Sequence, residues 1–129
     1  MTMEKQEIKA FFENNEHHIN ERFVALMMKE MPDHEGFGDQ TESKYRAGSR
    51  FLTPVIQTAL VTGTPAILDY QMEWAKDRLP QDNHPLPKLK QALTLYKQII
   101  DELFPEKLVE PAHALIDRML ARIPATEEK

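Results

Sequence analysis

Apolar residues recur at intervals of three and four positions along almost the whole chain, and polar residues occupy the positions between them. This spacing is typical of amphipathic α-helices, and no stretch alternates with the period of two that marks a β-strand. Prolines and glycines fall between the periodic stretches, where helices end. We therefore expect helices over residues 3–31, 42–62, 64–79, 86–104 and 105–123.

Two features leave the number of helices open. The polar stretch at residues 14–18 indicates either a bend in the first helix or a division into two helices. Pro54 indicates either a kink in the second helix or a shorter helix that Thr53 caps and Pro54 begins. Five or six helices with bends favour a globin-like bundle, in which helices cross at large angles, over a straight four-helix bundle. The predicted fold class is therefore all-α and globin-like.

Length, charge and cysteine content restrict the class of protein. The chain has 129 residues, and we expect a single domain over 1–129 whose residues 1–4 and 125–129 are frayed. Sixteen basic and 21 acidic residues give a net charge of −5, which disfavours binding to nucleic acid. There is no cysteine, and no apolar run approaches the ~18 residues of a membrane span. We therefore expect a cytoplasmic protein that binds neither nucleic acid nor membrane.

The five histidines form no metal or catalytic motif. His113 is followed by Leu115, as in histidine phosphotransfer modules, but Asp117 stands near the place of their lysine. A heme needs an axial ligand, usually histidine, and the helix expected at 64–79 contains none. We therefore expect no enzymatic activity, no metal and no cofactor. Two alternatives stay open. One is a globin-like protein that binds heme, another tetrapyrrole or a fatty acid, and the other is a histidine phosphotransfer or metal-binding helical protein.

Several large side chains on neighbouring predicted helices suit either a small pocket for an apolar ligand or a filled core. These pocket candidates are Phe23, Met27, Tyr70, Trp74 and Tyr96. Arg50, with Arg46 one turn earlier, suits either an anionic group such as a fatty-acid carboxylate or a surface ion pair.

The last two predicted helices have apolar residues outside their main stripes. These residues are Leu86, Leu95, Val109 and Leu120. A helix that is apolar on more than one side is either deeply buried or shared with a partner. Two terminal helices of so short a chain are hard to bury, so we expect a homodimer with a two-fold contact through them.

Several segments resemble a known family. They are Arg50-Phe51-Leu52-Thr53-Pro54, Leu60-x-x-Gly63 and Leu68-x-Tyr70-x-x-x-Trp74-Ala75, followed by the stretch 86–104 with Leu89, Leu93, Tyr96, Ile99 and Ile100. They are similar to the N-terminal sensory domains of RsbR-type stressosome regulators, and the resemblance extends over residues 8–123.

This resemblance implies a dimeric helical input domain with a globin fold and without heme. Family members normally precede an output domain, such as a STAS domain or a kinase, and some free-standing relatives of globin-like sensor domains bind a fatty acid and titrate a kinase. The resemblance therefore implies a sensory or regulatory module that acts on a regulatory protein or a kinase. It supplies no catalytic residues, and it leaves open whether the chain is free-standing or an excised input domain.

Overall fold

The computed structural model describes residues 3–31, 40–81 and 86–123. Within these residues the chain forms five α-helices and no β-strand. The helices are α1 (Lys5–Glu30), α2 (Thr41–Thr62), α3 (Ala66–Gln81), α4 (Leu86–Leu103) and α5 (Glu106–Ala121). The prediction of an all-α protein is confirmed, and the described residues contain the lower of the two helix numbers expected from the sequence.

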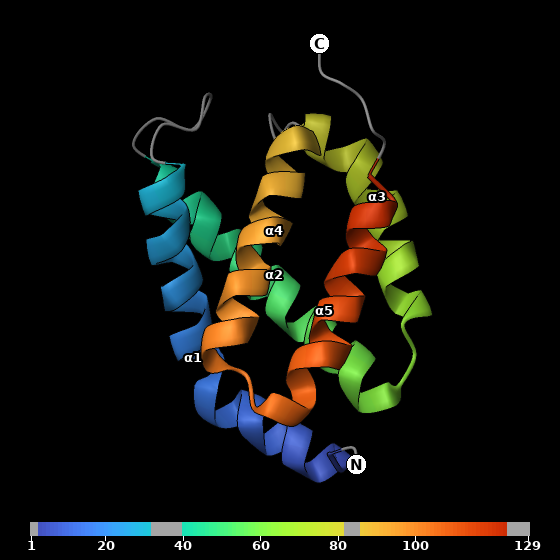
Figure 1. Ribbon diagram of the computed structural model, residues 1–129. Helices are drawn as coiled ribbons and strands as arrows, with labels where there is room; N and C mark the ends of the chain where they lie inside the picture. The colour runs from blue at the N-terminus through green and yellow to red at the C-terminus, as the bar shows by residue number, and fades with distance from the viewer. Residues whose placement is uncertain (1–2, 32–39, 82–85, 124–129) are drawn as a thin grey trace.

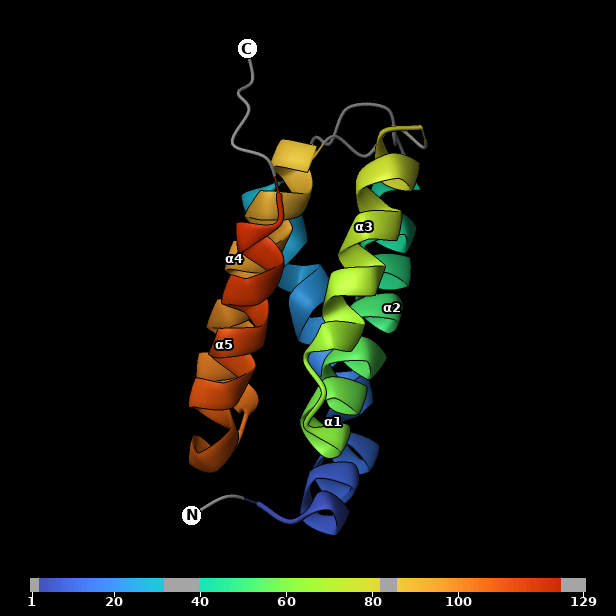
Figure 2. The same cartoon turned by 90° about the vertical axis from the view of Figure 1, so that its right-hand side faces the viewer.

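Consecutive helices run in opposite directions, so the bundle has an up-and-down course (Figure 1). α1 packs on α2 and α4, while α5 packs on α4, α3 and α2. Figure 2 shows the α4–α5 pair on one side of the bundle and the α2–α3 pair on the other. As a result, α1 and α3 end, and α2 and α4 begin, at one end of the bundle, which is the upper end in Figure 1.

α1 is one continuous helix that bends in its first half, the part that contains the polar stretch at residues 14–18 (Figure 1). Within that stretch, Asn15 Nδ2 donates a hydrogen bond of 2.8 Å to the carbonyl oxygen of Phe11, four residues earlier. Side chains that bond to a helix carbonyl commonly accompany bends, because they compete with the backbone donor. Of the two expectations for this segment, the bend holds and the division into two helices does not.

α2 is also continuous, with Pro54 inside it. Pro54 has no N–H to donate to the carbonyl of Arg50, so α2 passes this position without one backbone hydrogen bond. Thr53 caps no shorter helix, since its hydroxyl donates to Asn20 Oδ1 on α1 at 2.8 Å. α2 ends at Gly63, whose φ of 67° lies in the left-handed region that glycine adopts without a Cβ penalty.

The core contains one apolar face of every helix together with a short polar network. Its largest fully buried apolar side chains are Phe12, Ile19, Ile56, Leu68, Leu93, Ile99, Ile100 and Ile116. In the network, Asn20 Oδ1 accepts hydrogen bonds from Ser49 Oγ at 2.6 Å and from Thr53 Oγ1 at 2.8 Å. Since the single Thr53 hydroxyl hydrogen is directed to Asn20, the Tyr96 hydroxyl donates to Thr53 Oγ1, 2.8 Å away. The network therefore joins α1, α2 and α4 without an unsatisfied hydroxyl.

Ion pairs join neighbouring helices at the surface of the bundle. Three of them have two parallel hydrogen bonds: Arg22 with Glu102 between α1 and α4, Arg46 with Glu21 between α1 and α2, and Arg118 with Asp69 between α3 and α5. Such exposed pairs orient helices more than they stabilise the fold.

Candidate functional site

A pocket of about 370 Å³ lies between the helices, and its lining comes from the α1 segment, α2, α3, α4 and one residue of α5. Its inner wall is apolar and buried. The wall consists of Phe23, Met27, Met72, Leu93 and Met119, each at most 4% exposed. Methionine side chains are flexible and polarisable, so this wall can adapt to an apolar ligand.

The pocket exists because α3 and α4 touch little, while α3 packs more closely on α2 and α5. α3 contributes Met72, Trp74 and Ala75 to one side of the pocket, and α4 contributes Leu89 and Ala92 to the opposite side. α3 thus separates the pocket from solvent without being tightly held to α4.

Two aromatic rings form the outer edge of the pocket. Phe51 of α2 and Trp74 of α3 both line it, and both are 47% exposed. Their ring centroids lie 6.4 Å apart with the ring planes at 29°, a stacked arrangement. The guanidinium of Arg78 lies 5.7 Å from the Trp74 ring centroid and forms a cation–π contact with it. Gly48 provides space beside this edge, because an added Cβ there meets no atom within 4 Å.

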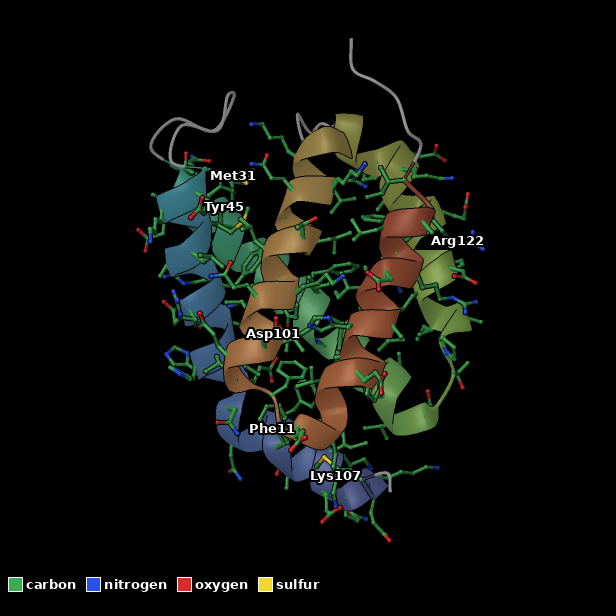
Figure 3. All side chains as sticks on the ribbon, viewed as in Figure 1. Phe11, Met31, Tyr45, Asp101, Lys107 and Arg122 are labelled. Atoms are coloured by element: carbon green, nitrogen blue, oxygen red, sulfur yellow. The ribbon has the colours of Figure 1, made fainter. Side chains whose placement is uncertain are left out.

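Few polar groups reach the pocket. The ionisable ones are Lys44, Tyr45 and Lys88, and Gln71 adds an amide. The Tyr45 hydroxyl donates a hydrogen bond of 2.6 Å to the carbonyl oxygen of Met31, and Figure 3 shows the two side by side near the upper end of the bundle. Burial raises the pKa of Tyr45, so its phenol is neutral at physiological pH.

The structure divides the six pocket candidates expected from the sequence into two groups. Phe23, Met27 and Trp74 line the pocket. Tyr96 does not line it, because its ring lies in the core against Phe23, with the centroids 5.5 Å apart, and its hydroxyl belongs to the Asn20 network.

The other two candidates, Tyr70 and Arg50, also lie outside the pocket lining. Tyr70 is 71% exposed on α3, and Arg50 is exposed on α2. Arg46, considered with Arg50 for an anionic group, instead forms ion pairs with Glu21 and Glu42. The proposed arginine site for an anion is therefore not assembled in this structure.

Lys44, Lys88 and Phe51 belong to the pocket but were not among the sequence candidates. Surface lysines occur on most helices, so the positions of Lys44 and Lys88 in the sequence do not indicate a pocket. Their role is visible only when the arrangement of the helices is known. The small residues Ala47 and Gly48 next to Phe51 do indicate a helix face with spare room, although they do not identify which helix faces it.

The residues expected at a dimer contact lie partly within the fold. Leu95, Val109 and Leu120 are half-buried and pack against the core. Leu86 is the first residue of α4, and its side chain lies outside the part of the chain that the structure describes.

None of the described histidines lines the pocket. His113 Nε2 lies 2.8 Å from Asp101 Oδ1 across the α4–α5 contact, and neither residue lines the pocket. Within residues 3–31, 40–81 and 86–123, no three His, Asp or Glu side chains come close enough together to hold a metal ion. His34 and His84 lie outside the described residues.

α3 is attached to α5 by a group of four charged residues. Asp69 receives both hydrogen bonds of Arg118, at 2.8 and 2.6 Å, and lies 3.1 Å from Arg122. Arg122, the residue directly after α5, also reaches Glu73, at 3.0 Å, and is labelled in Figure 3. The hydrogen bond from the Arg118 guanidinium is the main reason that the pKa of the Asp69 carboxyl is lowered.

Comparisons with known families, with curated proteins and with solved structures give no match to this chain. None of the helices in the described residues is long and apolar enough to cross a membrane. The described residues therefore define an all-α protein with five helices and a mainly apolar pocket between them.

Proposed function

We propose that this chain is a non-enzymatic sensory module that binds a small apolar ligand in the pocket between α1, α2, α3 and α4. The observation that carries the proposal is the pocket itself, whose buried inner wall is apolar throughout. Its volume of about 370 Å³ lies at the small end of the ~300–1,000 Å³ range of ligand sites.

The lining favours binding over catalysis. Among the described lining residues there is no carboxylate, imidazole, thiol or aliphatic hydroxyl, and the phenol of Tyr45 is bonded to the carbonyl oxygen of Met31. Methionines at four lining positions favour adaptable apolar contacts.

α3 is the element that we expect to respond to a ligand. It forms one side of the pocket through Met72 and Trp74, and it touches α4 only sparsely. A ligand that contacts α3 and α4 together stabilises one position of α3, which shifts the population of its conformations. A regulatory protein or kinase that contacts α3 would sense this shift.

The resemblance to RsbR-type sensory domains supports the same proposal and adds two parts to it. The first is a globin-like arrangement of the helices, and the second is a homodimer through α4 and α5. The half-buried positions of Leu95, Val109 and Leu120 leave part of each side chain available for such a contact. A solution mass of twice the 15.0 kDa chain at micromolar concentration supports the dimer, and a mass of 15.0 kDa argues against it.

The binding experiment uses N-phenyl-1-naphthylamine, a neutral apolar dye whose emission rises in an apolar site. We expect saturable binding that also changes the emission of Trp74, the only tryptophan of the chain. Gly48→Leu places a side chain at the pocket edge and should weaken dye binding at least about tenfold, while the matched control Gly48→Ala should not.

Binding that is absent, or equal in Gly48→Leu and Gly48→Ala, would overturn the proposal. The heme alternative is tested in the same preparation. Added heme should give no stoichiometric Soret shift, since the described lining residues include no histidine, which is the usual axial ligand. A stoichiometric Soret shift would favour the heme-binding alternative instead.

A further inference from the structure

The charged residues of the described pocket lining have the same sign. They are Lys44 and Lys88, and no Asp or Glu belongs to the described lining. This is notable in a chain whose net charge is −5, because acidic side chains are the more abundant kind. The pocket therefore has a cationic part within a mainly apolar lining.

Both lysines come from helix beginnings at the same end of the bundle. Lys44 is in the first turn of α2, which begins at Thr41, and Lys88 is in the first turn of α4, which begins at Leu86. These two helices both begin at the upper end of Figure 1. The backbone N–H groups of a helix N-terminus add partial positive charge there, which has the same sign as the two ammonium groups.

Lys88 is half-buried and forms no ion pair with any residue that the structure describes. Lys88 differs in this respect from the arginines at the helix contacts. Arg22, Arg46 and Arg118 each form an ion pair with a carboxylate. An anionic group on a ligand would supply the counter-charge that the lining itself does not provide to Lys88.

We infer, on the basis of the ligand-binding function proposed above, that the pocket takes a single-chain anionic amphiphile, with its anionic head at Lys88 and Lys44. The apolar chain lies along Met27, Met72 and Leu93 on the inner wall. The Phe51–Trp74 edge covers the part of the chain nearest to solvent. The lysine stems are themselves apolar and cover the first carbons next to the head.

The test compares ligands that share a ten-carbon chain and differ in the charge of the head. The probes are decanoate, decyl sulfate, 1-decanol and decyltrimethylammonium, each below its micelle-forming concentration and each measured by displacement of the naphthylamine dye. We expect both anions to bind about tenfold more tightly than 1-decanol and the cation to bind most weakly. Added salt should weaken the anions and leave 1-decanol unchanged.

Lys88→Met and Lys44→Met remove the charge but keep an apolar stem. Each should reduce the preference for decanoate over 1-decanol about two- to fivefold, and the double variant should remove it. Lys90→Met is the matched control, because Lys90 is exposed on α4 and does not line the pocket. Circular dichroism of each variant confirms that the helices are retained.

The outcomes separate this inference from the proposed function. Equal binding of decanoate and 1-decanol, with both lost in Gly48→Leu, would overturn the anionic head and leave the apolar pocket in place. A preference for decanoate that Lys88→Met and Lys90→Met reduce equally would also overturn it, since the charge would then act from the general surface. A protein that binds none of the four probes and no dye would contradict both proposals.

Discussion

The hydroxyl of Tyr96 and Thr53 Oγ1 lie 2.8 Å apart, and both side chains are fully buried. Because Thr53 directs its hydrogen to Asn20, the direction of the Tyr96 bond is fixed. Burial raises the pKa of Tyr96, so its phenol keeps its proton and continues to donate. These hydrogen bonds therefore hold Tyr96 of α4 in a fixed position against α1 and α2.

The direction of the hydrogen bonds in this network predicts that removing the Tyr96 hydroxyl and removing the Asn20 side chain lower the free energy of unfolding by different amounts. Tyr96→Phe removes one donor and leaves Thr53 bonded to Asn20, so the free energy of unfolding should fall by about 1 kcal/mol. Asn20→Ala leaves the hydroxyls of Ser49 and Thr53 without their shared acceptor, so the loss should be about 3 kcal/mol. Urea denaturation followed by circular dichroism measures both. Equal losses would mean that Asn20 is not the centre of the network.

The exposure of Trp74 predicts a small stability effect for its removal. Trp74→Ala deletes the stack with Phe51 and the contact with Arg78, which together contribute about 1–2 kcal/mol. Met72→Ala on the same helix removes a side chain that is 2% exposed and should cost about 2–5 kcal/mol. Thermal unfolding of both variants is the measurement. A larger loss for Trp74→Ala than for Met72→Ala would place the indole in the core.

The Asp69–Arg118 pair predicts a loss of stability in acid. The folded state lowers the pKa of Asp69, mainly through the hydrogen bonds from Arg118, while the unfolded chain keeps the ordinary value. The stabilisation is therefore complete above the ordinary pKa and is lost as the pH falls through the lowered one. Asp69→Asn should unfold at a lower temperature than the parent protein at neutral pH, and this difference should shrink in acid.

The control for this pH profile is Glu13→Gln. Glu13 is exposed on α1 and has no ion pair among the residues that the structure describes. Its variant should follow the parent profile at every pH. A difference between Asp69→Asn and the parent that stays constant into strong acid would show that the ion pair is not the cause.

Gly48 lies within α2 and Gly63 lies at its end. We expect substitution by alanine to change the free energy of unfolding in opposite directions at these two positions. Gly48 is inside the helix with open space around its Cα, so Gly48→Ala should raise the free energy of unfolding by about 0.5–1 kcal/mol. Gly63 has a φ of 67°, so Gly63→Ala should lower it by about 1 kcal/mol. Denaturant titration distinguishes the two signs. A loss of stability in Gly48→Ala would indicate that the space beside α2 is filled in solution.

Local sequence signals were sufficient for the secondary structure. The three- and four-residue spacing predicted the helices, and Gly63 predicted the end of α2. The polar stretch at 14–18 predicted either a bend or a division of α1, and the structure has the bend. These features depend on residues within one helix, so they can be read from neighbouring positions in the chain. Pro54 was ambiguous because its effect depends on whether Thr53 finds a partner on another helix, as it does in Asn20.

The pocket was only half predictable, because a lining is defined by how helices rotate against each other. Tyr70 and Trp74 are four residues apart and share a face of α3, yet Tyr70 is 71% exposed and only Trp74 reaches the pocket. Tyr96 has the same amphipathic character, but a polar partner in Thr53 holds it in the core. Side-chain type alone cannot separate these three cases.

The way α3 is attached has a consequence for the motions of the chain. Among its described side chains, Leu68, Met72 and Ala75 are buried, and charged residues near its beginning join it to α5. Its backbone amides can therefore exchange with solvent deuterium by a local opening that leaves the other four helices folded. Such an opening would also be a passage through which a guest molecule enters and leaves, and the opening rate of α3 would then set the upper limit of the association rate.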